Sequence, residues 1–189
     1  ENVRKVACAI ARYVIRSEKP GAGVLVGYDN RFGGEQFSRA AAETVAMTGT
    51  PVWLAEAPCP SPALSLLVRQ RGAAAGIMIT ASHNPYRWNG MKLKASYGSS
   101  ALPSIVAQVE QELEIVLDRG VPPLPPRADL VHSLDVLVPY LDTVEKLVDW
   151  EKLRAATMRF VSDPMHGSAR GLLPALMKRN GVVCDEIRG

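Results

Sequence analysis

The sequence predicts an α/β protein of three layers, in which helices cover both faces of a mixed, mainly parallel sheet. Short apolar runs bounded by Gly or Pro alternate along the chain with amphipathic patterns of helical period. Strands separated by helices pair most simply in parallel, through right-handed crossovers. The 189 residues, 47% of them hydrophobic, are enough for a real core. We therefore expect one α/β/α domain, followed by the beginning of a second, similar domain.

The expected elements of the first domain have local causes. An N-terminal helix gathers apolar side chains on one face, from Val6, Ile10, Tyr13 and Val14. Residues 58–62 form a rigid connector, with Ser61 as the N-cap and Pro62 at the first position of a helix that runs to about Arg71. The other expected helices are residues 35–47 and 102–117, and the expected strands are 24–28, 51–55, 76–79 and 91–95, the last at an edge of the sheet.

Residues 1–120 are expected to form the first domain, 121–134 a proline-rich link and 135–189 part of a second domain. The run Val121–Pro126 cannot continue a helix. After it we expect a long helix from Asp135 to about Ala156 despite Pro139, and then one βαβ unit made of a strand near 159–162, a helix near 170–179 and a final strand. The loop 163–171 is interpreted as a tight strand-to-helix turn rather than a phosphate cradle.

Composition narrows the class of function. The net charge of +3 is spread along the chain, without a Lys/Arg block, which favours an anionic small molecule over nucleic acid as partner. No apolar run has the length of a membrane span, so no membrane partner is expected. The three cysteines are few and scattered, which argues against disulfides or a zinc site and predicts a reducing, cytoplasmic location.

The most informative segment is residues 80–92, Thr-Ala-Ser-His-Asn-Pro-Tyr-Arg-Trp-Asn-Gly-Met-Lys, directly after the apolar run 76–79. A hydroxyl, an imidazole and a carboxamide follow one another, and Pro85 keeps Asn84 out of the helical region. This predicts an open polar loop at the carboxyl end of a strand, where α/β sheets place ligands. Residues 91–95 then alternate, so Lys92 and Lys94 leave one face of a strand and Ser82 and Lys92 can face one cleft.

Three interpretations of this loop compete. A Ser-His hydrolase is weakly indicated, because there is no G-x-S-x-G elbow and adjacent side chains in an extended chain point apart, which places His83 badly to activate Ser82. A serine that carries a phosphoryl group fits better, because Lys92, Asn84, His83 and backbone amides supply a cation and donors. The third interpretation is an ordinary surface turn capped by Ser82. Asp29 and Arg31, at the same sheet edge, are either a local ion pair or a substrate contact.

The block Thr-Ala-Ser-His-Asn-Pro, followed by Asn-Gly-Met-Lys, resembles the phosphoserine loop of the α-D-phosphohexomutase superfamily, the phosphoglucomutases and phosphomannomutases. Residues 26–31 and 58–63 also resemble segments of these enzymes. The resemblance implies that Ser82 is phosphorylated and passes its phosphoryl group to a hexose phosphate, through a hexose 1,6-bisphosphate. It further implies catalytic roles for Lys92 and His83, and substrate or phosphate binding by Asn84, Asn89 and Arg31.

The resemblance also implies parts that this sequence lacks. In the superfamily, Mg²⁺ is held by a short Asp-Gly-Asp-x-Asp run together with the phosphoserine, so Ser82 is the one metal ligand expected here and the others lie outside the chain. A Gly-rich turn with a catalytic arginine, and the third and fourth domains, are also unmatched. We therefore expect part of a longer intramolecular phosphotransferase, inactive alone and partnered by the remaining domains of its own polypeptide. The alternatives are a non-catalytic phosphosugar-binding or regulatory module, or a phosphoglucosamine mutase.

Overall fold

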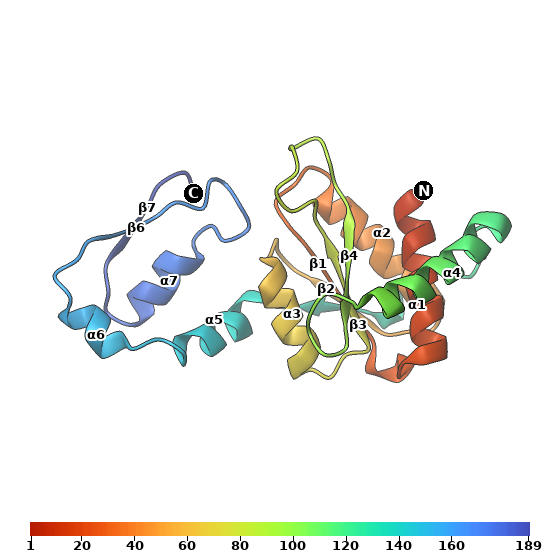
Figure 1. Ribbon diagram of the computed structural model, residues 1–189, viewed down its shortest axis with the longest axis horizontal. Coiled ribbons are helices and arrows are strands. Elements are labelled where there is room, and N and C mark those ends of the chain that lie inside the picture. Colours follow the sequence, from red (N-terminus) through yellow and green to blue (C-terminus); the bar gives the residue numbers. More distant parts are fainter.

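The computed structural model describes residues 1–189 and has two parts (Figure 1). The larger part is built on a five-stranded sheet with the order β4-β3-β1-β2-β5, and the smaller part has a two-stranded sheet made of β6 and β7. Helices lie on both faces of the larger sheet. The predicted three-layer α/β/α architecture is therefore confirmed.

Four of the five strands agree with the sequence prediction: β1 (Val24–Tyr28), β2 (Val52–Ala55), β3 (Ala75–Ile79) and β4 (Met91–Ala95). The strands β1 and β3 are buried along their whole length, as their apolar runs predict. They pair in parallel with each other, and β1 also pairs in parallel with β2. The strand β4 lies at the edge and runs antiparallel to β3, as expected.

The fifth strand, β5 (Val131–Leu134), corrects the predicted domain boundary. It pairs in parallel with β2, with Val52 opposite Val131 and Ala55 opposite Leu134, so residues 131–134 belong to the first sheet and not to the link. The segment has only two apolar residues, Val131 and Leu134, and this is too weak a pattern to indicate a strand. The segment becomes a strand because it pairs with the otherwise free edge of β2, and Leu134 is buried. The link shortens to the segment before β5, which includes the 3-10 helix η2 (Ala128–Leu130).

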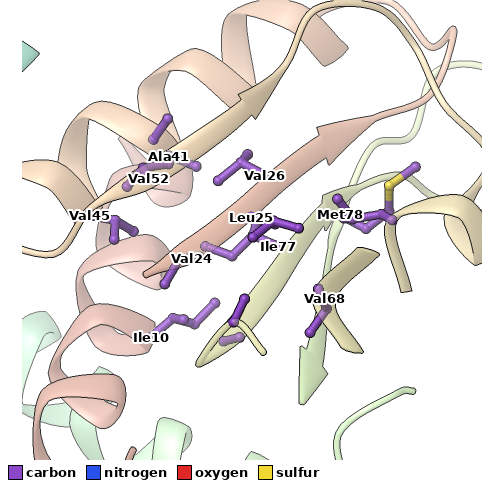
Figure 2. Packing of buried hydrophobic residues seen from close by; sticks show 14 of the residues in the cluster. Ile10, Val24, Leu25, Val26, Ala41, Val45, Val52, Val68, Ile77 and Met78 are labelled. Carbon is purple, nitrogen blue, oxygen red and sulfur yellow. The ribbon is translucent and has the colours of Figure 1, made fainter. Parts of the chain in front are cut away.

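Three helices lie on one side of the sheet, α1 (Asn2–Ser17), α2 (Gly34–Met47) and α4 (Pro103–Arg119), while α3 (Ser61–Gln70) lies on the other (Figure 1). Figure 2 shows the core, where Ile10 of α1 and Val45 of α2 gather with Val24 and Ile77 of the sheet. Each of these side chains is almost inaccessible to water, and burying one stabilises the fold by about 1.5–3 kcal/mol.

The helix α3 approaches the sheet closely because glycines face it. A Cβ atom on Gly76 would lie 2.6 Å from Cγ2 of Val68, and one on Gly27 would lie 3.2 Å from Cδ2 of Leu64. The helix begins at Ser61, with Pro60 as its N-cap residue and without a capping side chain. The expectation that Ser61 is the N-cap is thus wrong by one position, because the fixed φ of Pro60 and Pro62 sets where the first turn starts.

A charged cluster joins α1 to α4, and no local sequence pattern indicates it. The side chain of Glu112 is 7% exposed and accepts a hydrogen bond from Arg12 Nε at 2.6 Å, and it also pairs with Arg16. Glu112 is far from both arginines in the chain, so only the packing of the two helices brings them together. A buried carboxylate with two guanidinium partners fixes how α4 lies against α1.

The second part contains α5 (Leu137–Glu145), α6 (Trp150–Ala155), β6 (Phe160–Ser162), α7 (Leu172–Arg179) and β7 (Cys184–Glu186). The strands β6 and β7 are parallel, so the predicted βαβ unit is present. The predicted long helix 135–156 is wrong, because the chain breaks between α5 and α6, where Asp149 accepts a hydrogen bond from Lys152 N and caps α6. Pro139 lies in the first turn of α5, where its missing N–H costs nothing.

Candidate functional site

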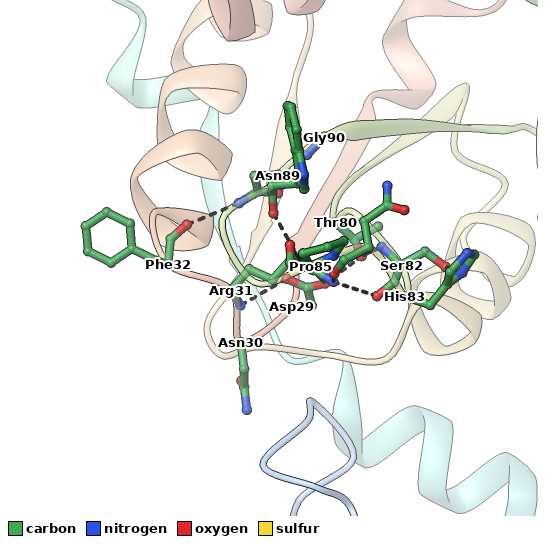
Figure 3. Close-up of polar contacts among 12 residues, drawn as sticks. Asp29, Asn30, Arg31, Phe32, Thr80, Ser82, His83, Pro85, Asn89 and Gly90 are labelled. Carbon is green, nitrogen blue, oxygen red and sulfur yellow. Dashed lines mark hydrogen bonds and ion pairs between the residues drawn. The ribbon is translucent and has the colours of Figure 1, made fainter.

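The loop between β3 and β4 passes abruptly from the interior to solvent. Thr80 and Ala81 are 6% and 7% exposed, whereas every residue from Ser82 to Trp88 is exposed. The loop lies at the carboxyl end of β3, next to the segment that follows β1, as Figure 3 shows. The predicted open polar loop at this sheet edge is therefore present.

Ser82 has an unusual backbone conformation that is stabilised by hydrogen bonds with the largely buried residues beneath the loop. Its φ of 58° is left-handed, which is costly for a residue with a Cβ. The Ser82 N–H donates to Thr80 Oγ1 at 2.9 Å, and this hydroxyl donates to Asp29 Oδ2 at 2.5 Å. The buried threonine therefore caps the turn, and the hydroxyl of Ser82 remains available at the surface.

The Ser82 hydroxyl has one neighbour, Nδ1 of His83, at 3.3 Å. This corrects the expectation that adjacent side chains point apart. That argument assumed an extended backbone, whereas the left-handed φ of Ser82 turns its side chain toward His83. The separation is longer than the usual distance of hydroxyl hydrogen bonds, and no carboxylate orients the imidazole, so the pair lacks the third member of a hydrolase triad.

Arg31 is engaged by the loop itself, although the resemblance implies that it binds substrate or phosphate. Its two terminal nitrogens donate to four backbone carbonyls of the loop, those of Ser82 (2.8 Å), Asn84 (2.6 Å), Pro85 (3.0 Å) and Trp88 (3.0 Å). Its Nε faces Asp29 Oδ2 at 3.5 Å. The Arg31 side chain is only 14% exposed. The geometry therefore favours a local ion pair of Arg31 with Asp29 over a substrate contact, and the same arginine holds the loop through its backbone carbonyls.

The two predicted asparagines have different surroundings. The Asn89 side chain shapes the loop, because Oδ1 accepts from Gly90 N at 2.9 Å and Nδ2 donates to the carbonyl of Phe32 at 3.3 Å. The Asn84 side chain is exposed and makes no hydrogen bond within the chain, so its amide is free to meet a ligand. Asn89 therefore supports the loop, and Asn84 is available for binding.

The strand β4 brings two lysines to the α3 side of the sheet. Lys92 pairs with Met78 and is exposed, while Lys94 pairs with Gly76 and is 7% exposed. Burial lowers the pKa of Lys94, and the positive charge of Lys92 adds to this. No hydrogen bond joins Lys92 to the loop of residues 80–90 between β3 and β4 (the Ser82 loop). The exposed ammonium stands near the start of β4, just after the loop ends, whereas Lys94 is covered by α3.

The chain by itself does not form a magnesium site. No group of three His, Cys, Asp or Glu side chains is placed to hold a metal ion. The carboxylate that contacts the base of the loop, that of Asp29, is already engaged by Thr80 and Arg31. Mg²⁺ requires several oxygen ligands in octahedral geometry, and the exposed face of the loop offers the hydroxyl of Ser82 without a carboxylate beside it.

In the second part, the carboxylate of Glu186 binds the backbone at the end of the loop 163–171. The carboxylate of Glu186 accepts from Gly171 N through both oxygens, at 2.9 and 3.1 Å, at the start of α7. This carboxylate takes the place that a phosphate would occupy at a helix N-terminus. The interpretation of 163–171 as a tight turn is therefore favoured over a phosphate cradle.

Sequence reasoning misses two contributors to the site. One is Thr80, since a buried polar residue directly after an apolar run is a sign that its hydroxyl has a partner. The other is Asn30, because no local pattern indicates that its side chain reaches His166 of the second part.

Together the fold and the site define an α/β/α domain that presents a serine hydroxyl to solvent from a braced loop at the carboxyl edge of its sheet. Residues 1–117 match the family model of phosphoglucomutase/phosphomannomutase, alpha/beta/alpha domain I. The chain belongs to this family.

Similar proteins agree with this assignment. A phosphoglucosamine mutase from Jannaschia sp. (strain CCS1) is 32% identical over 92% of this chain, which spans 38% of that protein. A phosphoglucomutase from Staphylococcus epidermidis is 30% identical over 93% of this chain, which spans 33% of that protein. The crystal structure of a candidate phosphomannomutase from Thermus thermophilus has a TM-score of 0.83 and 30% identity over 98% of this chain, and the chain covers 41% of it. The chain thus spans about two fifths of these relatives or less. None of its helices has the length and apolar composition needed to cross a bilayer.

Proposed function

We propose that the protein is part of a phosphohexose mutase, which interconverts hexose 1-phosphates and 6-phosphates through a phosphoserine at Ser82. The single observation that carries this proposal is the Ser82 loop itself. Its hydroxyl is exposed while its backbone is fixed by Thr80, Asp29 and Arg31, whose side chains are largely buried. A group that must meet two ends of one substrate requires such exposure together with a defined position.

In the proposed reaction, a hydroxyl oxygen of the sugar bonds to the phosphorus on Ser82 while the bond from phosphorus to Ser82 Oγ breaks. The sugar hydroxyl loses its proton and the serine oxygen regains one, so the product is a hexose 1,6-bisphosphate and free Ser82. The return step takes the other phosphoryl group back to Ser82. Lys92 screens the transferring oxygens or carries the proton, and His83, 3.3 Å from Ser82 Oγ, orients the loop or substrate.

The remaining predicted residues divide into two groups. Asn84, whose amide is free, binds substrate or its phosphate. Arg31 and Asn89 act indirectly by holding the loop. Mg²⁺ belongs to the proposed enzyme through the resemblance to its superfamily, with ligands that this chain does not contain besides Ser82. The polypeptide is proposed to act in the cytoplasm, on small phosphosugars.

The names of the relatives bear on the sugar. Several of the relatives that match this chain are phosphoglucosamine mutases, and others are phosphoglucomutases. A glucosamine phosphate is therefore the second candidate substrate beside glucose and mannose phosphates. Relative kcat/KM of the longer parent polypeptide for these hexose phosphates decides between them.

The test uses the parent polypeptide with Ser82→Ala, and with Ser99→Ala as the matched control. Ser99 is also exposed, lies in another loop and makes no side-chain hydrogen bond. Conversion of glucose 1-phosphate and glucosamine 1-phosphate to the 6-phosphates is measured, together with the intact mass after incubation with hexose 1,6-bisphosphate. We expect a phosphate on wild type and Ser99→Ala, and neither phosphate nor activity in Ser82→Ala.

Undiminished mutase activity in Ser82→Ala would exclude the proposed mechanism. Binding of hexose phosphates without conversion, in a wild-type parent that takes up no phosphate, would favour the alternative of a non-catalytic phosphosugar-binding module. The two outcomes are separated by the mass measurement, because only the mutase carries a covalent phosphate between turnovers.

A further inference from the structure

The three residues after β1 each bind a different part of the molecule. Asp29 accepts from Thr80 beneath the Ser82 loop, and Arg31 donates to four carbonyls of that loop. Between them, Asn30 points the other way and donates from Nδ2 to the carbonyl of His166, at 3.0 Å. Figure 3 shows the Asn30 side chain directed toward the blue loop of the second part. One short turn therefore contacts both the Ser82 loop and the second part.

Backbone strain is concentrated at the two loops that this turn connects. Four non-glycine residues have a positive φ, Ser82 (58°), Met165 (48°), His166 (60°) and Arg188 (52°). The last three are close together, because His166 N donates to the carbonyl of Arg188 at 2.8 Å. Strained conformations of this kind persist only where their surroundings impose them, and they are common at sites that switch or bind.

The strained loop of the second part is fixed by its own ion pair. Asp163 accepts from Met165 N at 3.0 Å and pairs with the guanidinium of Arg188. All of these groups lie at or near the surface. This loop, residues 163–167, is thus shaped within the second part and presents the carbonyl of His166 to Asn30.

We propose that the turn Asp29–Arg31 couples the position of loop 163–167 to the conformation of the Ser82 loop, with Asn30 as the positioning residue. Seating of loop 163–167 fixes Asn30, which fixes the adjacent Arg31 and the four carbonyls that it binds. Withdrawal of that loop releases the turn and lets the Ser82 loop open more often. The coupling is reciprocal, since each loop stabilises the arrangement that the other requires. Its importance for catalysis rests on the proposed function, but the coupling itself does not.

The exposed position of the Asn30 bond suits such a role. A single neutral hydrogen bond at the surface is weak, so it biases the Ser82 loop without locking it. A second amide bridge between the two parts joins Gln70 Nε2 of α3 to Thr143 Oγ1 of α5 at 3.1 Å. It is also exposed and donated by a side-chain amide, but it is attached to neither strained loop. Gln70 therefore provides a matched control.

The test measures hydrogen exchange of backbone amides in the 189-residue chain with Asn30→Ala. The reporting amides are those of Ser82, Asn84 and Trp88, all of which are hydrogen-bonded within the loop. We expect these amides to exchange about two- to fivefold faster, the effect of losing one neutral hydrogen bond. The amide of His166, on the other side of the bridge, should accelerate as well. Gln70→Ala should leave all four rates as in wild type.

A second variant approaches the coupling from the opposite side. Arg188→Ala removes the ion pair with Asp163 and leaves Asn30 and Arg31 intact. If the coupling exists, the Ser82 and Asn84 amides accelerate in this variant too, although the change lies in the second part. Circular dichroism verifies that both variants are folded, which their exposed positions favour.

Two results would overturn the proposal. One is wild-type exchange of the Ser82 loop in both Asn30→Ala and Arg188→Ala. The other is equal acceleration in Gln70→Ala, which would mean that any loosening between the parts has the same effect. Neither result depends on phosphoryl transfer, so a failure here is distinguishable from a failure of the proposed mutase activity.

Discussion

Arg31→Lys is the sharpest test of how the Ser82 loop is held. The guanidinium of Arg31 makes four bonds to loop carbonyls, at 2.6 to 3.0 Å, and faces Asp29 with its remaining N–H. A lysine keeps the charge but offers three donors from a single nitrogen, which cannot reach carbonyls on both sides of a planar fork. The substitution therefore isolates geometry from charge.

The expected loss follows from the number of bonds. If at least two of the four bonds are lost, at about 1 kcal/mol each, the closed loop is destabilised by about 2 kcal/mol. This corresponds to an increase of about 30-fold in the open population of the loop. The carbonyls released are at the surface and regain water, so a larger cost is not expected. The core strands do not depend on these bonds and should keep their protection.

The measurement is hydrogen exchange of the Asn84 and Trp88 amides, with amides of the buried strand β3 as an internal reference. Arg39→Lys is the control, since Arg39 is exposed and makes only one long ion pair, with Glu35 at 3.8 Å. Loop amides of Arg31→Lys that exchange as slowly as those of wild type would refute the reasoning. Acceleration of the β3 amides to the same degree would also refute it, because the effect would then be global.

Three further predictions concern stability. Glu112→Ala should lower the free energy of unfolding, measured with urea, by about 2 kcal/mol, which is less than for a fully buried ion pair because Arg16 is 60% exposed. An unchanged urea midpoint would contradict the role of this charged cluster in fixing α4 against α1. Gly76→Ala should destabilise by about 1–3 kcal/mol through overlap with Val68, whereas Gly21→Ala, with open space around it, should not; Val68→Ala added to Gly76→Ala should restore part of the loss. Burial raises the pKa of Cys59 from 9.0 to about 11, so the folded chain holds this proton more tightly than the unfolded chain. The resulting stabilisation, up to about 2–3 kcal/mol, is complete below pH 9 and is lost as the pH rises toward 11. Urea unfolding of wild type and Cys59→Ala between about pH 8 and about pH 10.5 should show their difference shrinking above about pH 9, and a constant difference would count against it.

The sequence was most informative where a segment carries its own pattern. The strands β1 and β3 are continuous apolar runs and are buried on both faces, so burial and pattern agree without help from distant residues. The strand β5 has no such pattern, because it is defined by the free edge of β2, far earlier in the chain. The same holds for the break after α5, where Asp149 starts a new helix inside a segment with continuous helical character.

The residues of the site likewise fall into those that a local pattern predicts and those whose positions depend on distant contacts. The exposure of Ser82 and Asn84 follows from the polar run and Pro85, which are local. The position of His83 depends on the left-handed φ of Ser82, and that conformation is imposed by the contacts of Thr80 and Arg31. The bonds of Arg31 join segments that are distant in the sequence, so no spacing rule predicts that its guanidinium binds four carbonyls of this loop.

Electrostatics gives a reason for placing an arginine below the loop rather than on it. Four carbonyl oxygens converge on the guanidinium, so the negative ends of these peptide dipoles point inward, away from the exposed side of the loop. Asp29 balances the charge of Arg31 in the same layer. The exposed side of the loop, where the Ser82 hydroxyl and the free Asn84 amide lie, is therefore not lined by these four carbonyl oxygens. The charge of Arg31 thus keeps these carbonyl oxygens turned away from the exposed side of the loop, and it does so without a hydrogen bond to the Ser82 hydroxyl.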